Sequence, residues 1–189
     1  MTYPNWFGAT GAQTNFERHL AQFKGKPVQF LQIGAFTGDA SVWMLENILT
    51  HAHATLTDVD TWRGSDENSH HAMDFEDVYS VYTDKTKRYE NVHVFRETSD
   101  SFFESNNMNY DFVYIDGDHT AFSVMRDGMN AFDCLNVGGI IAFDDYQWSE
   151  GRGNFYEPRP AVDAFFNITR DKMKVIELGW QVWLQKEFV

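Results

Sequence analysis

The amino-acid sequence predicts an α/β fold, a three-layer α/β/α sandwich around a mostly parallel seven-stranded sheet. Short apolar runs alternate with amphipathic stretches along the chain, a pattern that favours parallel strands joined by helices. The chain has 189 residues, of which 43% are hydrophobic, enough for one compact domain with a substantial core. Two apolar runs near its C-terminal end lie close enough in sequence to form a hairpin, which supplies one antiparallel strand.

Three strands are predicted in the first half of the chain, each an apolar or alternating run of strand length. They span residues 28–33, 54–59 and 91–96, and helices are expected at 39–49 and 74–89. Thr14 and Glu17 have the spacing of a capping box, so a further helix is predicted over residues 15–23. The stretch 61–73 is polar and contains glycine, which indicates a loop.

The second half of the chain continues the alternation and adds the hairpin. Its predicted strands span residues 111–115, 140–143, 173–178 and 181–185, and its predicted helices span 119–135 and 161–170. Residues 136–139 indicate a turn, and Pro160 suits the first turn of the last helix. We therefore expect a single domain over residues 1–189, made of an N-terminal helical extension (1–27), a cofactor and metal core (28–148) and a C-terminal helix and hairpin (149–189).

The charge balance disfavours anionic partners. Lys and Arg number 15, Asp and Glu number 28, the net charge is −13, and the basic residues are scattered. A surface this acidic repels phosphate backbones and anionic lipids, so neither nucleic acid nor a membrane is an expected partner. Cys134 is the single cysteine, and no apolar stretch has the length of a signal peptide or membrane span. We expect a cytoplasmic protein and leave the formation of a homo-oligomer open.

The residues that follow the first two strands indicate a ligand site. Ligands bind at the carboxyl ends of the strands in an open parallel sheet, and the loop there contains Gly34, Ala35 and Gly38. Such a loop lets backbone amides approach a ligand closely. Asp60 lies 22 residues after Gly38, a spacing at which a carboxylate accepts both hydroxyls of a ribose. Each feature alone is also typical of an ordinary turn, but together they favour a nucleoside-bearing cofactor.

Two residues of the same loop separate the candidate cofactors. Phe36 occupies the place of the middle glycine of a dinucleotide-binding loop and would crowd a pyrophosphate. Asp39 follows the last glycine and would repel it. A nucleoside with a cationic, zwitterionic tail suits this acidic loop better, which points to S-adenosylmethionine rather than NAD.

Two later strand ends, 28 residues apart, each carry two aspartates. Asp116 and Asp118 follow one strand, and Asp144 and Asp145 follow the next. Neighbouring strand ends bring these carboxylates together, where they repel one another unless protons or a cation lie between them. Mg²⁺, which prefers oxygen ligands, is the simplest occupant. The alternative is that Asp118 caps the following helix and the second pair forms a solvated turn.

These segments resemble the class I S-adenosylmethionine-dependent methyltransferases, in particular the small O-methyltransferases of the macrocin and of the caffeoyl-CoA or catechol groups. The resemblance rests on the segments FLQIGAFTGDAS, LTDVDTWRGSDE, DFVYIDGDHTAFSVMRD and LNVGGIIAFDDY, and it covers roughly residues 28–148. It implies a Rossmann-like fold. The later segment PRPAVDAFF is similar to the next helix of the family.

The resemblance also implies roles for individual residues. The cofactor-binding residues would be Gln32, Gly34, Ala35, Phe36, Gly38, Asp60, Trp62, Ser99 and Asp116. Among them, Asp60 would hold the ribose, Ser99 would lie near the adenine and Trp62 would form a stacking wall. Gln32 stands where the family commonly has Glu, and it retains a hydrogen-bond acceptor. The Mg²⁺ ligands would be Asp116, Asp144 and Asp145.

The expected activity is methyl transfer from S-adenosylmethionine to a hydroxyl of a small acceptor, a sugar or another diol, with Mg²⁺ assisting. Asp118 or His119 would act as the general base, and for His119 a place beside the metal or at the start of the helix is also open. Two alternatives remain open. They are a catalytically silent module that binds a nucleoside cofactor and a metal-independent methyltransferase.

Overall fold

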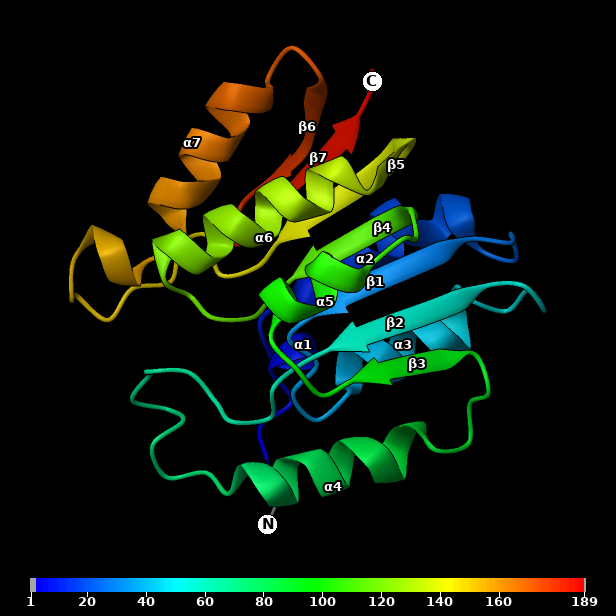
Figure 1. Cartoon of the computed structure of the whole chain (residues 1–189), viewed down its shortest axis with the longest axis horizontal. Coiled ribbons are helices and arrows are strands. Elements are labelled where there is room, and N and C mark those ends of the chain that lie inside the picture. The colour runs from blue at the N-terminus through cyan, green and yellow to red at the C-terminus, as the bar shows by residue number, and fades with distance from the viewer. Residues whose placement is uncertain (1–2, 189) are drawn as a thin grey trace. The chain divides into compact units, whose positions relative to one another are not determined.

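The structure, a computed structural model, describes residues 3–188 (Figure 1). The chain divides into two compact units, one ending at Thr98 and the other beginning at Ser99. Within the described residues, strands and helices alternate as predicted, and the two units are described separately. The single domain expected from the sequence stays a prediction.

The first unit contains three parallel strands in the order β3-β2-β1. The strands are β1 (Gln29–Ile33), β2 (Thr55–Val59) and β3 (Val92–Phe95). The helices are α1 (Trp6–Ala9), α2 (Ala12–Leu20), η1 (Ala21–Phe23), α3 (Asp39–Asn47) and α4 (Phe75–Thr86). Helix α3, which follows β1 in the chain, packs on β2 and on α4. Helix α4 follows β2, so the elements after the first two strands are in contact with each other.

The start of α2 differs from the prediction. The helix begins after Gly11, a residue with φ 83° that provides no side-chain cap, and Thr14 lies inside the helix. The capping box was wrong because the Glu17 carboxylate accepts from the Gln13 side chain, one turn earlier, at 2.8 Å. Helix α1 was not predicted, although Asn5 marks its start by accepting from the Gly8 backbone N–H at 2.8 Å.

The second unit contains four strands in the order β4-β5-β7-β6. The strands are β4 (Tyr110–Ile115), β5 (Leu135–Phe143), β6 (Met173–Leu178) and β7 (Val182–Lys186). The helices are α5 (Ser99–Ser105), α6 (Ala121–Asp133), η2 (Asn154–Tyr156) and α7 (Arg159–Thr169). Strand β4 is parallel to β5, and β7 is antiparallel to both of its neighbours, which confirms the predicted antiparallel strand and hairpin.

Two elements of the second unit extend beyond the prediction. Strand β5 begins at Leu135, which pairs with Tyr110, so residues 136–139 belong to the strand and not to a turn. The pairing with β4 shifts after Tyr110, and this irregularity accommodates the two glycines that suggested a turn. Helix α5 is polar and short, and the sequence analysis did not predict it.

Close packing on one glycine holds α6 against the sheet and α7. A Cβ atom on Gly128 would lie 3.0 Å from the Phe143 ring and 3.1 Å from the Phe165 ring. The rings of Phe143 and Phe165 are themselves 5.1 Å apart, in an edge-to-face arrangement. This contact fixes the C-terminal end of β5, from which the aspartate pair follows.

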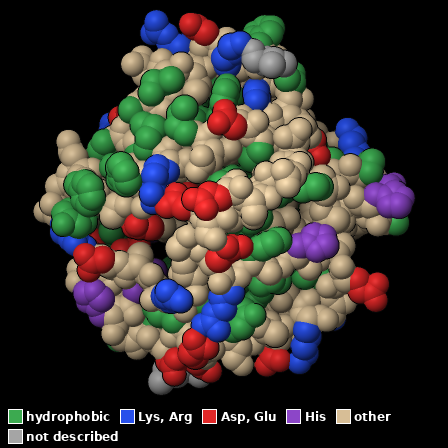
Figure 2. Space-filling view, viewed as in Figure 1, with side chains coloured by type: hydrophobic (Ala, Val, Ile, Leu, Met, Phe, Trp, Pro, Cys, Tyr) green, Lys and Arg blue, Asp and Glu red, His purple; other side chains and the backbone are tan. Residues whose placement is uncertain are grey.

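The surface agrees with the scattered basic residues of the sequence. On the face shown in Figure 2, Lys and Arg side chains are dispersed among Asp and Glu and form no continuous basic area. None of the helices described here is both long enough and apolar enough to cross a membrane.

We expect Gly38→Ala to destabilise the protein more than Gly11→Ala does. Both glycines precede a helix with left-handed backbone, φ 78° and 83°, so alanine costs about 1 kcal/mol of strain at either position. Only at Gly38 would the new Cβ meet a ring, that of Tyr82, at 2.9 Å. Urea unfolding should show an additional loss of about 1–3 kcal/mol for Gly38→Ala. Equal losses would contradict a close approach of loop and ring.

Candidate active site

Three non-glycine residues between 3 and 188 have a left-handed backbone. They are Phe36 (φ 45°), Trp62 (φ 46°) and Asp145 (φ 54°). They follow β1, β2 and β5, and each lies close after the carboxyl end of its strand. Such conformations cost about 1–3 kcal/mol and persist where the surrounding contacts enforce them, often at functional sites. The segments that contain them are therefore the first places to examine.

In the first unit, the Asp60 carboxylate connects the loops after β1 and β2. Its Oδ2 accepts the backbone N–H groups of Ala35 at 2.8 Å and Phe36 at 3.0 Å. Its Oδ1 accepts the backbone N–H of Trp62 at 2.7 Å. Bonds to a charged acceptor are stronger than those between neutral groups, so one side chain fixes both left-handed residues.

Trp62 forms a second connection between the same loops. Its indole Nε1 donates to the backbone oxygen of Phe36 at 2.8 Å. The ring is 1% exposed and lies 4.7 Å from the rings of Tyr79 and Tyr82. In this structure Trp62 therefore packs into the unit and supports the loop, and its expected place as a stacking wall stays a prediction.

Gln32 supports the loop from the end of β1. The side chain is buried, its Nε2 donates to the Gly34 backbone oxygen at 2.8 Å, and the Ser41 hydroxyl donates to its Oε1 at 3.4 Å. The Gly38 backbone N–H donates to the oxygen of Ala35 at 2.8 Å and closes the turn. These bonds shape the loop, while the expected contact of Gln32 with the cofactor stays a prediction.

The two residues that disfavoured a pyrophosphate differ in their surroundings. Asp39 is paired with Lys85 at 2.7 Å and accepts from Thr37 at 2.8 Å, so its charge is largely compensated. The Phe36 ring stacks on Trp6 at 4.7 Å. The bulk of Phe36 is thus the firmer of the two arguments against a dinucleotide.

A buried carboxyl group lies beneath this loop. Asp58 on β2 is fully buried and accepts a hydrogen bond from the Tyr82 hydroxyl at 2.7 Å. Burial raises the pKa of Asp58 to about 7, although the bond from Tyr82 acts in the opposite direction. The sequence analysis assigned Asp58 no role, and its only signal there was a charged residue inside an apolar strand.

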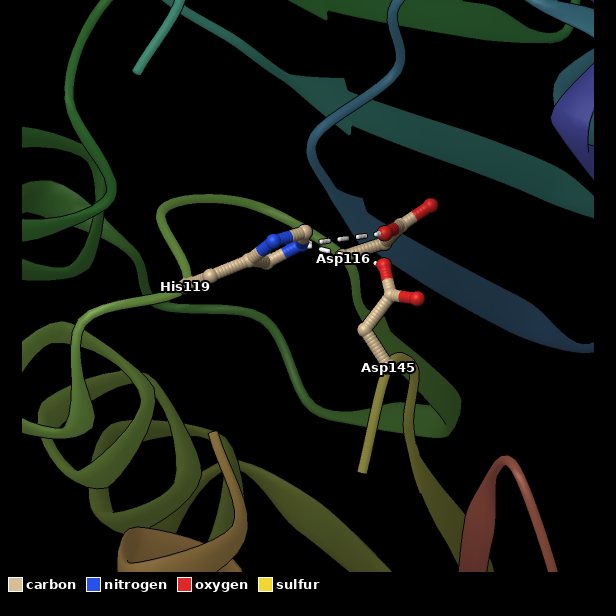
Figure 3. Close-up of side chains that lie close together, drawn as sticks. All are labelled: Asp116, His119 and Asp145. Atoms are coloured by element: carbon tan, nitrogen blue, oxygen red, sulfur yellow. Dashed lines mark ion pairs between the residues drawn. The ribbon is translucent and has the colours of Figure 1, made fainter. Parts of the chain in front are cut away.

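In the second unit, two carboxylates and one imidazole meet beyond β4 and β5 (Figure 3). His119 Nε2 lies 3.1 Å from Asp145 Oδ2 and 3.9 Å from Asp116 Oδ1. One donor atom from each of the three residues lies within 4.8 Å of the others. Oxygen and nitrogen donors at these separations need only small shifts to bind one divalent cation at about 2.0–2.2 Å. The donor set therefore suits a divalent cation, and the binding of Mg²⁺ stays a prediction.

Asp144, the third predicted ligand, is held by other groups. The Tyr114 hydroxyl donates to its Oδ2, and the Asp145 backbone N–H donates to its Oδ1 at 2.8 Å. Burial and the charge of Asp145 raise the pKa of Asp144 to about 6. Burial and the charge of Asp144 raise the pKa of Asp116 well above its ordinary value. The carboxylates therefore repel one another as predicted, and a direct role of Asp144 as ligand stays a prediction.

Asp118 lies at the start of α6. Its Oδ1 accepts the Thr120 backbone N–H at 3.0 Å, and its Oδ2 accepts the Ser123 hydroxyl at 2.8 Å. These contacts match the alternative in which Asp118 stabilises the helix start. The side chain is nevertheless exposed, and it can still accept a proton.

Ser99 begins α5 and bonds to a buried acidic residue. Asp127 on α6 is 3% exposed, burial raises its pKa to about 7, and the bond from Ser99 offsets part of that shift. The adjacent Asp100 pairs with Arg126 at 2.7 Å. The start of α5 is thus tied to α6, and proximity of Ser99 to an adenine stays a prediction.

Three aromatic residues contact the side chains of this site. Trp148 lies edge-to-face with His119 at 4.8 Å. Tyr114 binds Asp144, and Trp180 Nε1 donates to Asp145 Oδ1 at 2.9 Å. No local pattern marks Tyr114 or Trp180, because each reaches its aspartate through the folded sheet.

Residues 31–146 match the family described as methyltransferase domain. The match covers more than half of the chain and includes every predicted site residue, from Gln32 to Asp145. The chain belongs to this family, which confirms the resemblance to class I methyltransferases. A search of curated protein sequences finds no match.

Solved structures confirm the Rossmann-like fold. A proposed rRNA methylase from Clostridium thermocellum has a TM-score of 0.67 and 12% identity, and the match covers 100% of this chain and 99% of that one. The N-methyltransferase NodS from Bradyrhizobium japonicum WM9 has a TM-score of 0.64 and 13% identity, with coverage of 97% and 98%. The O-methyltransferase TomG from Streptomyces achromogenes, solved with S-adenosylmethionine, has a TM-score of 0.65 and 10% identity, with coverage of 99% and 92%. At these identities the likeness shows the fold alone.

We expect Asp58→Asn to remove part of the pH dependence of stability. The folded-state pKa of Asp58, about 7, lies above the ordinary value of 3.8. The contribution of Asp58 to the free energy of unfolding is therefore complete below about pH 4 and is lost as the pH rises through 7. Asn keeps an acceptor for Tyr82 and cannot ionise. The stability of the variant relative to the natural protein should therefore increase from pH 4 to pH 8, by at most about 4 kcal/mol.

Denaturant unfolding across this pH range measures the effect, with the exposed Asp84→Asn on α4 as the matched control. A stability difference that stays constant with pH would show that Asp58 does not titrate in this range.

Proposed function

We propose that this protein transfers a methyl group from S-adenosylmethionine to a hydroxyl of a small acceptor, a sugar or another diol, with assistance from a divalent cation. The observation that carries the proposal is the meeting of Asp116, His119 and Asp145 at the strand ends of a methyltransferase domain. Two carboxylates and an imidazole suit a divalent cation, and a cation suits an oxygen acceptor. The similar fold of TomG, an O-methyltransferase, is consistent with this choice.

The loops of the first unit suit the nucleoside part of the cofactor. S-adenosylmethionine supplies, when bound, a sulfonium methyl group for attack by an oxygen nucleophile. The carboxylate of Asp60 has about four acceptor positions, and three are taken by the backbone N–H groups of Ala35, Phe36 and Trp62. One position on Oδ1 remains, so Asp60 would accept one ribose hydroxyl while it holds the loops in place.

The residues of the second unit suit the acceptor. A cation such as Mg²⁺ or Mn²⁺, held by Asp116, His119 and Asp145, would lower the pKa of an acceptor hydroxyl. His119 directs Nε2 toward the two carboxylates, which supports a role as the third ligand. Asp118, exposed on the same loop, would then accept the proton of the hydroxyl. With a net charge of −13, the protein suits a small acceptor better than a polyanion.

A metal-independent methyltransferase is the second candidate. The 3.1 Å separation between His119 Nε2 and Asp145 Oδ2 favours it, because a carboxylate at this distance stabilises an imidazolium. In that case the His119–Asp145 pair, and not a metal-bound site, would take up the proton of the acceptor hydroxyl. The two candidates differ in whether a divalent cation binds at all.

We expect S-adenosylhomocysteine to bind the natural protein and to bind Asp60→Ala at least about tenfold more weakly. The variant loses a ribose acceptor and the bonds that shape the loop, each worth about 1.5–3 kcal/mol for a charged group. Isothermal titration calorimetry measures the affinity, with Asp84→Asn as control and NAD as a ligand that should not bind. No binding by the natural protein would contradict the proposal, and binding without methylation of any diol would indicate the catalytically silent module.

We expect His119→Asn to weaken Mn²⁺ binding at least tenfold and Asp144→Asn to weaken it much less. In the proposed site His119 is a ligand, whereas both Asp144 oxygens accept bonds from protein groups. Mn²⁺ titration followed by electron paramagnetic resonance measures both affinities, with the exposed Asp163→Asn on α7 as control. The reverse order would restore Asp144 as the ligand in place of His119.

A further inference from the structure

The turn between β6 and β7 is bonded to the segment that carries the aspartate pair. The Tyr146 backbone N–H donates to the Trp180 oxygen at 2.9 Å, and the Gln147 side chain donates to the Gly179 oxygen at 2.9 Å. Asp145 lies between the end of β5 and these two contacts, and its backbone is left-handed, with φ 54°. An aspartate in this conformation needs such external support, because the strain otherwise favours an extended backbone.

The same turn also binds the Asp145 side chain. Trp180 Nε1 donates to Asp145 Oδ1 at 2.9 Å, and Oδ2 of the same carboxylate lies 3.1 Å from His119 Nε2. The two oxygens of a carboxylate rotate together, so a bond that fixes Oδ1 also fixes the direction of Oδ2. The indole N–H therefore favours the carboxylate orientation in which the other oxygen faces His119.

Trp180 is only partly packed. The residue is 41% exposed, so more than half of its surface is covered and the rest faces solvent. Its indole N–H nevertheless has an acceptor within the protein. The neighbouring Gln181 is buried and donates to the Tyr114 hydroxyl at 3.4 Å, which in turn donates to Asp144. One turn thus reaches both aspartates that follow β5.

We propose that Trp180 is a positioning residue that orients the Asp145 carboxylate for a divalent cation held with Asp116 and His119. This inference rests on the proposed cation-assisted function. Without the indole N–H, the Asp145 carboxylate is free to rotate and the cation loses a preset ligand. Partners that orient metal ligands in this way commonly contribute about 10–100-fold to metal affinity.

The test is Mn²⁺ binding to the full chain, measured by electron paramagnetic resonance of the free ion. Trp180→Phe removes the N–H and keeps an aromatic ring, and we expect its Mn²⁺ affinity to fall about 10–100-fold. Leu178→Ala, at an exposed position beside the same turn, is the matched control and should bind Mn²⁺ as the natural protein does. S-adenosylhomocysteine affinity should be unchanged in both variants, since the bonds of the turn given above are all to residues of the second unit.

Natural Mn²⁺ affinity in Trp180→Phe would overturn the positioning role and leave the proposed function intact. If the natural protein binds S-adenosylhomocysteine but no Mn²⁺, the cation-assisted function fails and the role of Trp180 fails with it. Trp180→Met, which also lacks a donor, repeats the comparison if the melting temperature shows that Trp180→Phe is unfolded.

Discussion

The candidate cofactor loops depend on the hydrogen bonds that the Asp60 carboxylate accepts. It accepts three backbone N–H groups, two from the loop after β1 and one from the loop after β2. Two of these groups belong to Phe36 and Trp62, whose backbones are left-handed. A charged acceptor makes each bond stronger than a neutral one, so a single side chain offsets the strain of two residues. The indole bond from Trp62 to Phe36 then joins the loops a second time.

Both units hold acidic side chains that are partly or fully buried, and this burial is costly. Asp58 in the first unit, and Asp116, Asp127 and Asp144 in the second, have pKa values raised chiefly by burial. Apolar residues at these positions would stabilise the fold more, because a buried charge must lose its hydration. Side chains with pKa values shifted in this way are enriched at functional sites. The hydroxyls of Tyr82 and Tyr114 reduce the cost at two of them.

Local signals in the sequence predicted the strands and the loops that follow them, because an apolar run ending in glycine or aspartate needs no distant partner to be recognised. The glycine loop from Gly34 and the aspartates beyond the later strands were found in this way. The approach of His119 to Asp145 and the bond from Trp180 depend on how β4, β5 and β7 pair, which no short segment records. At Thr14 a local signal misled the prediction. Thr14 and Glu17 have the spacing of a capping box, but the Glu17 carboxylate accepts from the Gln13 side chain and Thr14 lies inside the helix.

The strand order of the second unit separates local from non-local contacts. Strands β6 and β7 are neighbours in sequence, so they can pair as a hairpin across the turn that carries Trp180 without help from the rest of the sheet. Within the described residues of this unit, the hairpin joins the other strands only through the pairing of β7 with β5, and that pairing must close the long connection that follows β5. The bonds from the turn to the segment after β5 therefore depend on the non-local pairing, whereas the turn itself does not.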